Sequence, residues 1–232
     1  PRMRDCYGTE AMGETAENVA EQLGITREAQ DAYAVRSQQK AAAARARGRH
    51  AEEIVPVEVP AGRKGTATVS EDEFLRPDTT METLGRLRPA FRAGGTVTAG
   101  NSSGLNDGAC ALLVASEAAC AEHGLTPLAR VVAVTAAGVE PRVMGLGPVP
   151  ATRRVLQQTG LALDQMDVIE LNEAFAAQVV GSLRELGVAD DDPRVNPSGG
   201  AIALGHPLGM SGARLLLSAA RDLAATGGRY GL

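Results

Sequence analysis

One stretch constrains this chain more than any other: residues 196–214, where five of the 27 glycines stand close to His206 and Pro207. Glycine has no Cβ, so the backbone can fold tightly and a ligand can approach it closely. Pro207 stiffens the turn and biases His206 away from helical dihedrals. Ordering so many glycines costs conformational entropy, which favours a functional site around His206. The alternative is a glycine-rich turn before a helix, with His206 as a buried histidine whose hydrogen bonds are satisfied.

The composition is ordinary for a globular protein. A chain of 232 residues can form one large domain or two small ones, and 44% of its residues are hydrophobic. Aromatic residues make up only 3%, so Ala, Val, Leu and Ile must build the core. A net charge of −5 gives no reason to expect a nucleic-acid or membrane partner. No apolar run reaches the roughly 18 residues of a membrane span, and no secretory signal is recognisable.

The cysteines point to a reducing compartment. Cys6, Cys110 and Cys120 are odd in number and widely spaced. That pattern fits neither a disulfide framework nor a zinc site. We therefore expect a cytoplasmic protein without a bound metal.

Helical signals open the chain. Apolar residues at helical spacing predict a helix over residues 14–24, closed by Gly24. Thr26 can cap a second helix, with Glu28 in its first turn, that continues to Gly48.

A hairpin and two irregular stretches follow. Alternating valines over residues 55–59 and a β-prone run over residues 66–69 predict two paired strands near an edge. Residues 71–90 are polar and charged, which is typical of an ordered surface loop. Residues 95–108 are mostly small and offer many backbone N–H groups and hydroxyls at close quarters.

Strands and helices alternate in the rest of the chain. The predicted strands cover residues 110–115, 131–134 and 168–171, and the predicted helices cover residues 116–122, 151–158, 174–186 and 211–225. This alternation favours an α/β layered fold with crossover connections. Residues 229–232 begin a further strand, and the chain opens on Pro1, so we expect it to be cut at both ends.

Several motifs together resemble the thiolase family, the acetyl-CoA C-acyltransferases. The main ones are residues 172–175, with the sequence Asn-Glu-Ala-Phe, and the small-residue stretches at 199–214 and 95–108. Residues 12–20, 87–91 and 143–145 match as well, in order along essentially the whole chain. The chain is most similar to the degradative 3-oxoacyl-CoA and β-ketoadipyl-CoA thiolases of β-oxidation and aromatic degradation. Asn-Glu-Ala-Phe followed by Gly-His-Pro favours thiolases over the ketoacyl synthases that share the fold.

The resemblance implies a layered αβαβα fold with an inserted loop domain, incomplete at both ends. On that map, residues 1–104 are the loop domain that binds coenzyme A. Residues 105–127 end the N-terminal half, and residues 128–232 are the C-terminal half without its last strands. The family is usually a homodimer or homotetramer.

The resemblance also implies a chemistry. Thiolases cleave 3-oxoacyl-CoA, or form it by Claisen condensation, through an acyl-cysteine intermediate. This needs a thiolate, a base and an oxyanion hole. The histidine at His206 would activate the nucleophile and donate to the oxyanion, and Asn172 would hold a water that donates to the same oxygen. The alternative for Asn172 is an N-cap of the helix that begins near Ala174.

Coenzyme A and acetyl-CoA enter as substrates, with no permanently bound cofactor implied. The family's binding positions carry over to Met12, Arg76, Thr83, Phe91, Ala99, Ser102, Ser103, Met144 and Phe175. Core packing is the alternative role for Phe91, Met144 and Phe175, and simple solvent exposure is the alternative for Arg76. Ala11 stands where short-chain biosynthetic thiolases carry a histidine, which argues against acetoacetyl-CoA as the preferred substrate.

The cysteines depart from the family pattern. The family's nucleophile would lie before Pro1 and its second catalytic cysteine beyond Leu232, and none of the three cysteines matches either motif. We therefore expect this chain alone not to catalyse thiolysis. A non-catalytic protein that binds CoA or acyl groups and an inactive truncated product are the alternatives.

Overall fold

The computed structural model describes residues 10–62 and 65–232. Its first two helices confirm the predictions. Helix α2 (Met12–Leu23) ends at Gly24, whose φ of 61° is left-handed, a conformation glycine adopts without strain. Helix α3 (Arg27–Ala46) begins after Thr26, whose side chain accepts a hydrogen bond from the backbone N–H of Ala29.

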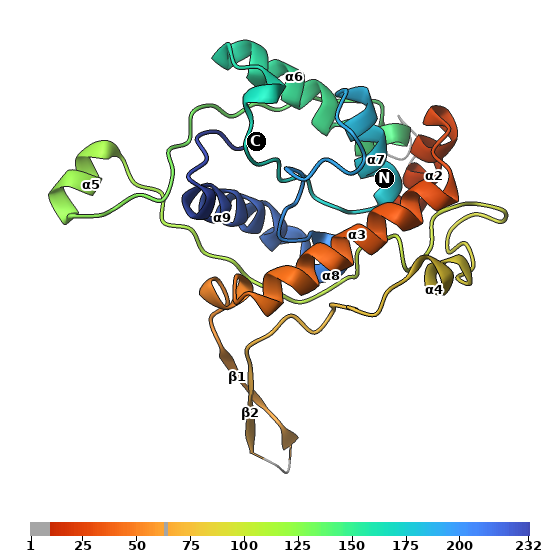
Figure 1. Ribbon diagram of the computed structural model, residues 1–232, viewed down its shortest axis with the longest axis horizontal. Helices are drawn as coiled ribbons and strands as arrows, with labels where there is room; N and C mark the ends of the chain where they lie inside the picture. The colour runs from red at the N-terminus through yellow and green to blue at the C-terminus, as the bar shows by residue number, and fades with distance from the viewer. Residues whose placement is uncertain (1–9, 63–64) are drawn as a thin grey trace.

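The main hydrophobic core lies between helices from both ends of the sequence. Helix α7 (Ala176–Glu185) packs against α2 and α3, and the 3₁₀ segment η3 (Pro141–Leu146) packs against α2 and α7. In Figure 1, α3 crosses the molecule diagonally beside these elements. Gly181 allows the close approach, since a Cβ there would lie 3.0 Å from Val19 Cγ1. Val97 and Ile202, one from each small-residue stretch, belong to this core.

The predicted hairpin is confirmed, with part of its turn, residues 63–64, outside the described residues. Strand β1 (Val57–Pro60) pairs antiparallel with β2 (Thr66–Val69) and follows the 3₁₀ segment η1 (His50–Glu52). The hairpin projects away from the helices (Figure 1).

One helix interrupts the loop expected over residues 71–90. Helix α4 (Met81–Gly85) forms there because Thr80 and Thr83 make a reciprocal capping box.

The remaining predicted helices are confirmed, with ends shifted by a few residues. They are α5 (Glu117–His123), α6 (Pro148–Thr159), α7 and α9 (Leu208–Thr226). Among the described residues, the short elements η1, η3, η4 (Leu163–Gln165) and α8 (Ala201–Leu204) were also not predicted, and α8 lies inside the glycine-rich stretch. No helix in the described part of the chain is long and apolar enough to cross a bilayer.

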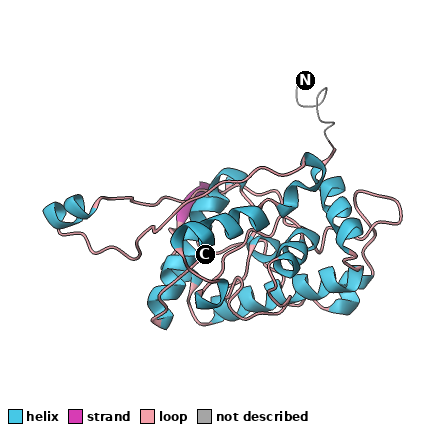
Figure 2. Cartoon of the chain, turned by 90° about the horizontal axis from the view of Figure 1, so that it is seen from above, coloured by secondary structure: helices cyan, strands magenta, loops and turns pink. Residues whose placement is uncertain are grey.

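The strands predicted at residues 110–115 and 131–134 are wrong. Both segments lack strand pairing in the structure, and Leu113 and Val114 are each 83% exposed. A strand needs hydrogen bonds to a neighbour, which apolar composition alone does not supply. Within residues 10–62 and 65–232 no segment forms strand bridges with them; they flank α5, which reaches away from the body (Figures 1 and 2).

The strand predicted at residues 168–171 survives as the middle of three extended segments. Ile169 bridges in parallel to Val195, and Val168 bridges in parallel to Gly231. These isolated bridges fall short of a regular sheet. Helices α7 and α9 lie in the connections between the three segments, which is the α/β crossover arrangement. The carboxyl end of the middle segment leads directly into Asn172.

Candidate functional site

The turn after residue 171 is fixed by an asparagine from the neighbouring segment. Asn196 accepts a hydrogen bond from Leu171 N at 2.8 Å and donates one to Leu171 O, also at 2.8 Å. Its φ of 43° is unusual for a residue other than glycine, and buried hydrogen bonds hold it there. Asn172 and the glycine-rich stretch therefore leave adjacent segments in defined directions.

Glu173 is a fully buried carboxylate that joins three parts of the chain. Its four donors are Tyr33 Oη (2.9 Å), Ser37 Oγ (2.6 Å), Asn196 Nδ2 (2.8 Å) and Ile202 N (3.0 Å). Burial, followed by the charge of Glu173, raises the pKa of Tyr33 far above its ordinary value, so the phenol stays a donor. A Cβ at Gly200 would overlap this carboxylate, which explains the glycine. Glu173 therefore serves the architecture that holds its neighbour Asn172.

His206 is held by three side chains from three segments. Its Nε2 lies 3.3 Å from Asn172 Nδ2, and its Nδ1 lies 2.6 Å from Ser211 Oγ. Its backbone N–H donates to Asn106 Oδ1 at 3.1 Å. Burial lowers the pKa of His206 below its ordinary value, and the charge of Arg214 lowers it further. The imidazole is therefore neutral at neutral pH and can accept a proton.

The predicted pair of catalytic residues thus meets in space. Asn172 does not cap a helix, because α7 begins at Ala176 and its N-cap position, Phe175, makes no side-chain cap bond. The side-chain oxygen of Asn172, Oδ1, is buried without a hydrogen-bond partner in the described part of the chain. Among those residues, no three His, Cys, Asp or Glu side chains gather as a metal site would require.

An open cleft of about 430 Å³ adjoins this turn. Residues 106–110 form one wall and residues 207–210 the other. Gly205 lets the two walls approach each other closely, because a Cβ there would lie 2.5 Å from Asn106 Oδ1. Its φ of 95° also favours glycine. Cys110 stands on the first wall, where burial raises the pKa of its thiol. No hydrogen bond joins Cys110 or Cys120 to His206 in the described residues.

A buried Glu–Arg pair lies beside the site. Glu170 Oε2 accepts from Arg214 Nη1 at 3.0 Å, and both side chains are largely buried. Desolvation raises the pKa of Glu170 to about 8, although the charge of Arg214 opposes the shift. Sequence reasoning missed this pair, because two residues 44 positions apart carry no shared pattern.

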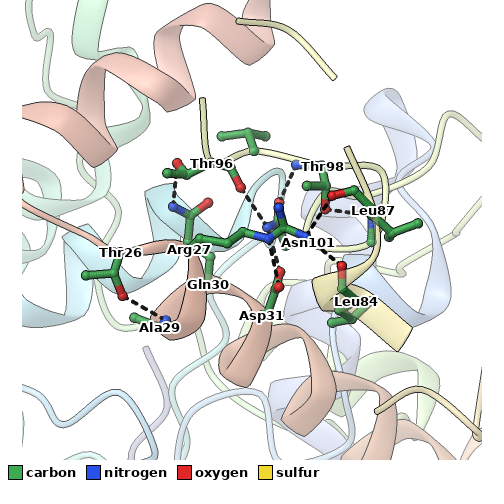
Figure 3. A network of polar contacts seen from close by, with 12 residues as sticks. Thr26, Arg27, Ala29, Gln30, Asp31, Leu84, Leu87, Thr96, Thr98 and Asn101 are labelled. Atoms are coloured by element: carbon green, nitrogen blue, oxygen red, sulfur yellow. Dashed lines mark hydrogen bonds and ion pairs between the residues drawn. The ribbon is translucent and has the colours of Figure 1, made fainter. Parts of the chain in front are cut away.

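The second small-residue stretch is tied to helix α3 (Figure 3). Asn101 Nδ2 donates to Asp31 Oδ1 at 2.9 Å, and Gln30 Nε2 donates to Thr96 Oγ1 at 2.8 Å. The N–H groups of residues 96 and 97 donate to the buried carboxylate of Glu17. These two backbone donors are therefore already used by the fold.

Four of the predicted CoA-binding residues gather next to Asn172. Ser103 donates from both N and Oγ to Ala174 O, at 3.0 and 3.1 Å, and Ser102 forms a bridge with Phe175. The rings of Phe91 and Phe175 meet edge to face with centroids 5.9 Å apart. Packing is thus a real role for both phenylalanines, and Phe91 also keeps 42% exposure.

No hydrogen bond in the described residues joins the other five predicted binding residues to His206. Met12 and Met144 are about half exposed on α2 and η3, and Ala99 is exposed in its loop. Arg76 Nη1 donates to the carbonyls of residues 73, 74 and 75. The Thr83 hydroxyl is engaged in the α4 capping box.

Two contacts of His206 were missed by sequence reasoning. Asn106 was noted only as part of a small-residue stretch, and Ser211 only as the start of a helix. The position of Ser211 five residues after His206, on the first turn of a helix, was the signal that could have identified it.

The comparisons with known proteins agree along the whole chain. Residues 1–118 match the model of the thiolase N-terminal domain, and residues 125–232 match that of the thiolase C-terminal domain. The 3-oxoadipyl-CoA/3-oxo-5,6-dehydrosuberyl-CoA thiolase of Escherichia coli K12 is 63% identical over 100% of this chain and 58% of its own length. The β-ketoadipyl-CoA thiolase of Pseudomonas putida is 60% identical over the same shares. The chain thus spans somewhat more than half the length of these relatives.

Solved structures give the same result. The crystal structure of the Bacillus anthracis acetyl-CoA acetyltransferase has a TM-score of 0.91 and 45% identity, covering 95% of this chain and 55% of that one. Human mitochondrial 3-ketoacyl-CoA thiolase has a TM-score of 0.87 and 43% identity, again over 95% and 55%. The expected layered α/β fold is therefore confirmed.

Proposed function

Because this chain belongs to the thiolase family, we propose that the protein is an acyl-CoA:acetyl-CoA C-acyltransferase that cleaves or forms 3-oxoacyl-CoA through an acyl-cysteine. The observation that carries the proposal is the 3.3 Å approach of Asn172 Nδ2 to His206 Nε2, beyond the carboxyl end of a parallel segment. That edge is where α/β folds place their ligands.

His206 and Asn172 divide the work. His206 takes the proton of the attacking thiol, and burial suits it to this role by keeping the imidazole neutral. Asn172 holds a water, which donates with His206 to the oxygen that gains charge.

The nucleophile is a cysteine other than Cys110 and Cys120. Neither thiol hydrogen-bonds to His206, and burial raises the pKa of Cys110, which disfavours the reactive thiolate. We therefore expect a purified polypeptide of residues 1–232 to show no thiolase turnover.

The loop domain, residues 1–104, binds coenzyme A, and residues 105–127 and 128–232 belong to the two thiolase halves. Met12, Arg76, Thr83, Phe91, Ala99, Ser102, Ser103, Met144 and Phe175 line the path of CoA and the acyl chain. The substrate is 3-oxoadipyl-CoA, as in the names of the relatives from Escherichia coli and Pseudomonas putida. The protein acts in the cytoplasm as a homodimer or homotetramer.

Turnover of the full-length protein tests the function. We expect CoA-dependent cleavage of 3-oxoadipyl-CoA, with a higher kcat/KM than for acetoacetyl-CoA. His206→Ala should lower kcat by about 100-fold or more, the usual share of a general base. His123→Ala, in exposed helix α5, is the control and should leave kcat unchanged. CoA binding without turnover would identify a non-catalytic acyl-CoA-binding protein instead.

A further inference from the structure

Both ring nitrogens of His206 have a protein partner. Nδ1 faces Ser211 Oγ at 2.6 Å, and Nε2 faces Asn172 Nδ2 at 3.3 Å. A neutral imidazole carries one N–H donor and one acceptor, so its two partners must together select the tautomer.

The serine side favours a proton on Nδ1. Ser211 is the fourth residue of α9, and its Oγ lies 3.2 Å from the carbonyl oxygen of Pro207, four residues earlier. A serine hydroxyl in this position can donate to that carbonyl. Its lone pairs then face Nδ1, which requires Nδ1 to carry a hydrogen. Ser211 is only 3% exposed, so water offers no competing partner.

The asparagine side agrees. An amide Nδ2 only donates, so Nε2 must be the acceptor. The opposite tautomer would need the Asn172 amide reversed. Its Nδ2 would then occupy the buried position where Oδ1 has no partner in the described residues. Burying an amide N–H without an acceptor is unfavourable. With the proton on Nδ1, both the imidazole N–H and the amide N–H that faces it have acceptors; with the proton on Nε2, one amide N–H is buried without an acceptor.

We propose that Ser211 is a positioning residue that holds His206 with its proton on Nδ1, leaving Nε2 as the site that accepts the proton of the attacking thiol. In that step the Asn172 N–H releases Nε2, the S–H bond breaks, its electron pair stays on sulfur and the proton binds Nε2. The resulting imidazolium keeps its Nδ1–H on Ser211 Oγ. The assignment of the step rests on the proposed function; the tautomer does not.

The tautomer is read directly from ¹⁵N NMR of histidine-labelled full-length protein above the pKa of His206. We expect Nδ1 to show the shift of a protonated nitrogen and Nε2 that of an unprotonated one. Ser211→Thr keeps the hydroxyl and should keep this pattern. A wild-type spectrum with the proton on Nε2 overturns the proposal, whether or not the protein turns over 3-oxoacyl-CoA.

Ser211→Ala supplies the second measurement. Because Ser211 accepts from Nδ1–H, it stabilises the imidazolium more than the neutral ring, so its loss should lower the pKa of His206. The acid limb of the kcat profile should then move to lower pH, with kcat at least about tenfold lower and KM little changed. A serine that donated to Nδ1 would give the opposite shift.

Ser218→Ala is the matched control. Ser218 lies on the same helix, is 4% exposed and makes no hydrogen bond to His206. It removes a buried hydroxyl of the same helix and should not move the pH profile. An equal pH shift in both variants, or a rise of the pKa in Ser211→Ala, contradicts the proposal.

Discussion

The backbone of His206 depends on Asn106, a residue one hundred positions earlier in the sequence. The carbonyl oxygen of its side chain accepts the His206 N–H at 3.1 Å and packs against Gly205, which has no room for a Cβ. Without this hydrogen bond the backbone N–H of His206 would lose its partner and the turn would be less restrained. The imidazole would then shift with the backbone.

Replacing Asn106 should therefore disturb the site selectively. We expect Asn106→Ala to lower kcat about tenfold, because a 1 Å displacement of a catalytic group is costly. Asn106→Asp keeps the acceptor, and its charge should raise the pKa of His206 and move the acid limb of kcat upward. Glu122→Ala, at an exposed position of α5, is the control variant. Equal losses in Asn106→Ala and Glu122→Ala would exclude a positioning role.

Glu170 makes the stability of the fold depend on pH. Its pKa is raised from 4.5 to about 8, so the folded state binds more protons than the unfolded state between those values. The contribution to stability is complete below about pH 4.5 and is lost as pH rises through 8, at up to about 1.4 kcal/mol per pH unit.

Thermal melts between pH 5 and 8.5 measure this effect. Glu170→Gln should flatten the decline in Tm with rising pH, because glutamine does not titrate. Glu185→Gln changes a carboxylate that is only partly buried in its salt bridge and should leave the slope as it is in the wild type. If the slope of Glu170→Gln equals that of the wild type, Glu170 is ionised in the fold at neutral pH.

Individual site residues were predictable only where a motif marked them. Motifs predicted His206 and Asn172, and the structure brings the two side chains together at 3.3 Å; their catalytic roles stay predictions. Ser211 and Asn106 were not, because a hydroxyl or an amide takes its role from the atom it faces. Nothing in the local sequence states which atom that is.

Secondary structure was predictable where its determinants are local. Helices α2 and α3 follow from apolar spacing, the Thr26 cap and the Gly24 terminator. Residues 110–115 failed as a strand because pairing depends on segments distant in sequence. Helix α8 was hidden because one turn inside a glycine-rich stretch has no periodicity to read.

The glycine-rich stretch contains two kinds of glycine, which differ in whether the fold requires them. Gly199 has a φ of 86°, and a Cβ there would lie 2.8 Å from the backbone of Ala41 on α3. Gly212 lies within α9 with open space around it. Only the first kind is required by the fold.

Alanine at the two positions should have opposite effects. Gly199→Ala should destabilise the fold by about 3 kcal/mol through strain and overlap. Gly212→Ala should stabilise it by up to about 1 kcal/mol, because alanine loses less entropy in a helix. Urea unfolding measures both, and destabilisation of similar size in both variants would refute the distinction.

Over the whole molecule, α3 connects segments that the sequence keeps far apart. Gln38 Nε2 donates to Ile202 O at 3.1 Å, while Gln38 Oε1 accepts from Arg76 N at 2.8 Å. The loop that holds Arg76, a proposed CoA-binding residue, is thereby fixed to α8, five residues or fewer before His206. Such links over 38 to 164 positions leave no trace in local sequence patterns.

Removing the hydrogen bonds of Gln38 should weaken CoA binding more than it slows catalysis. For Gln38→Ala in the full-length protein we expect a severalfold higher KM for CoA with kcat changed less than twofold. Arg36→Ala, which removes a contact of the same helix to Asp190 O, is the control and should leave KM unchanged. An unchanged KM in Gln38→Ala would show that the Arg76 loop holds its place without α3.

The β1–β2 hairpin offers a practical use. Its strands pair with each other, with Glu58 opposite Thr68, and both residues are exposed. The hairpin as a whole projects away from the helical body (Figure 1). A fluorescent amino acid introduced at Glu58 would report rotational diffusion of the whole particle without touching the turn at His206. Anisotropy of that label would then count subunits in solution while turnover proceeds undisturbed.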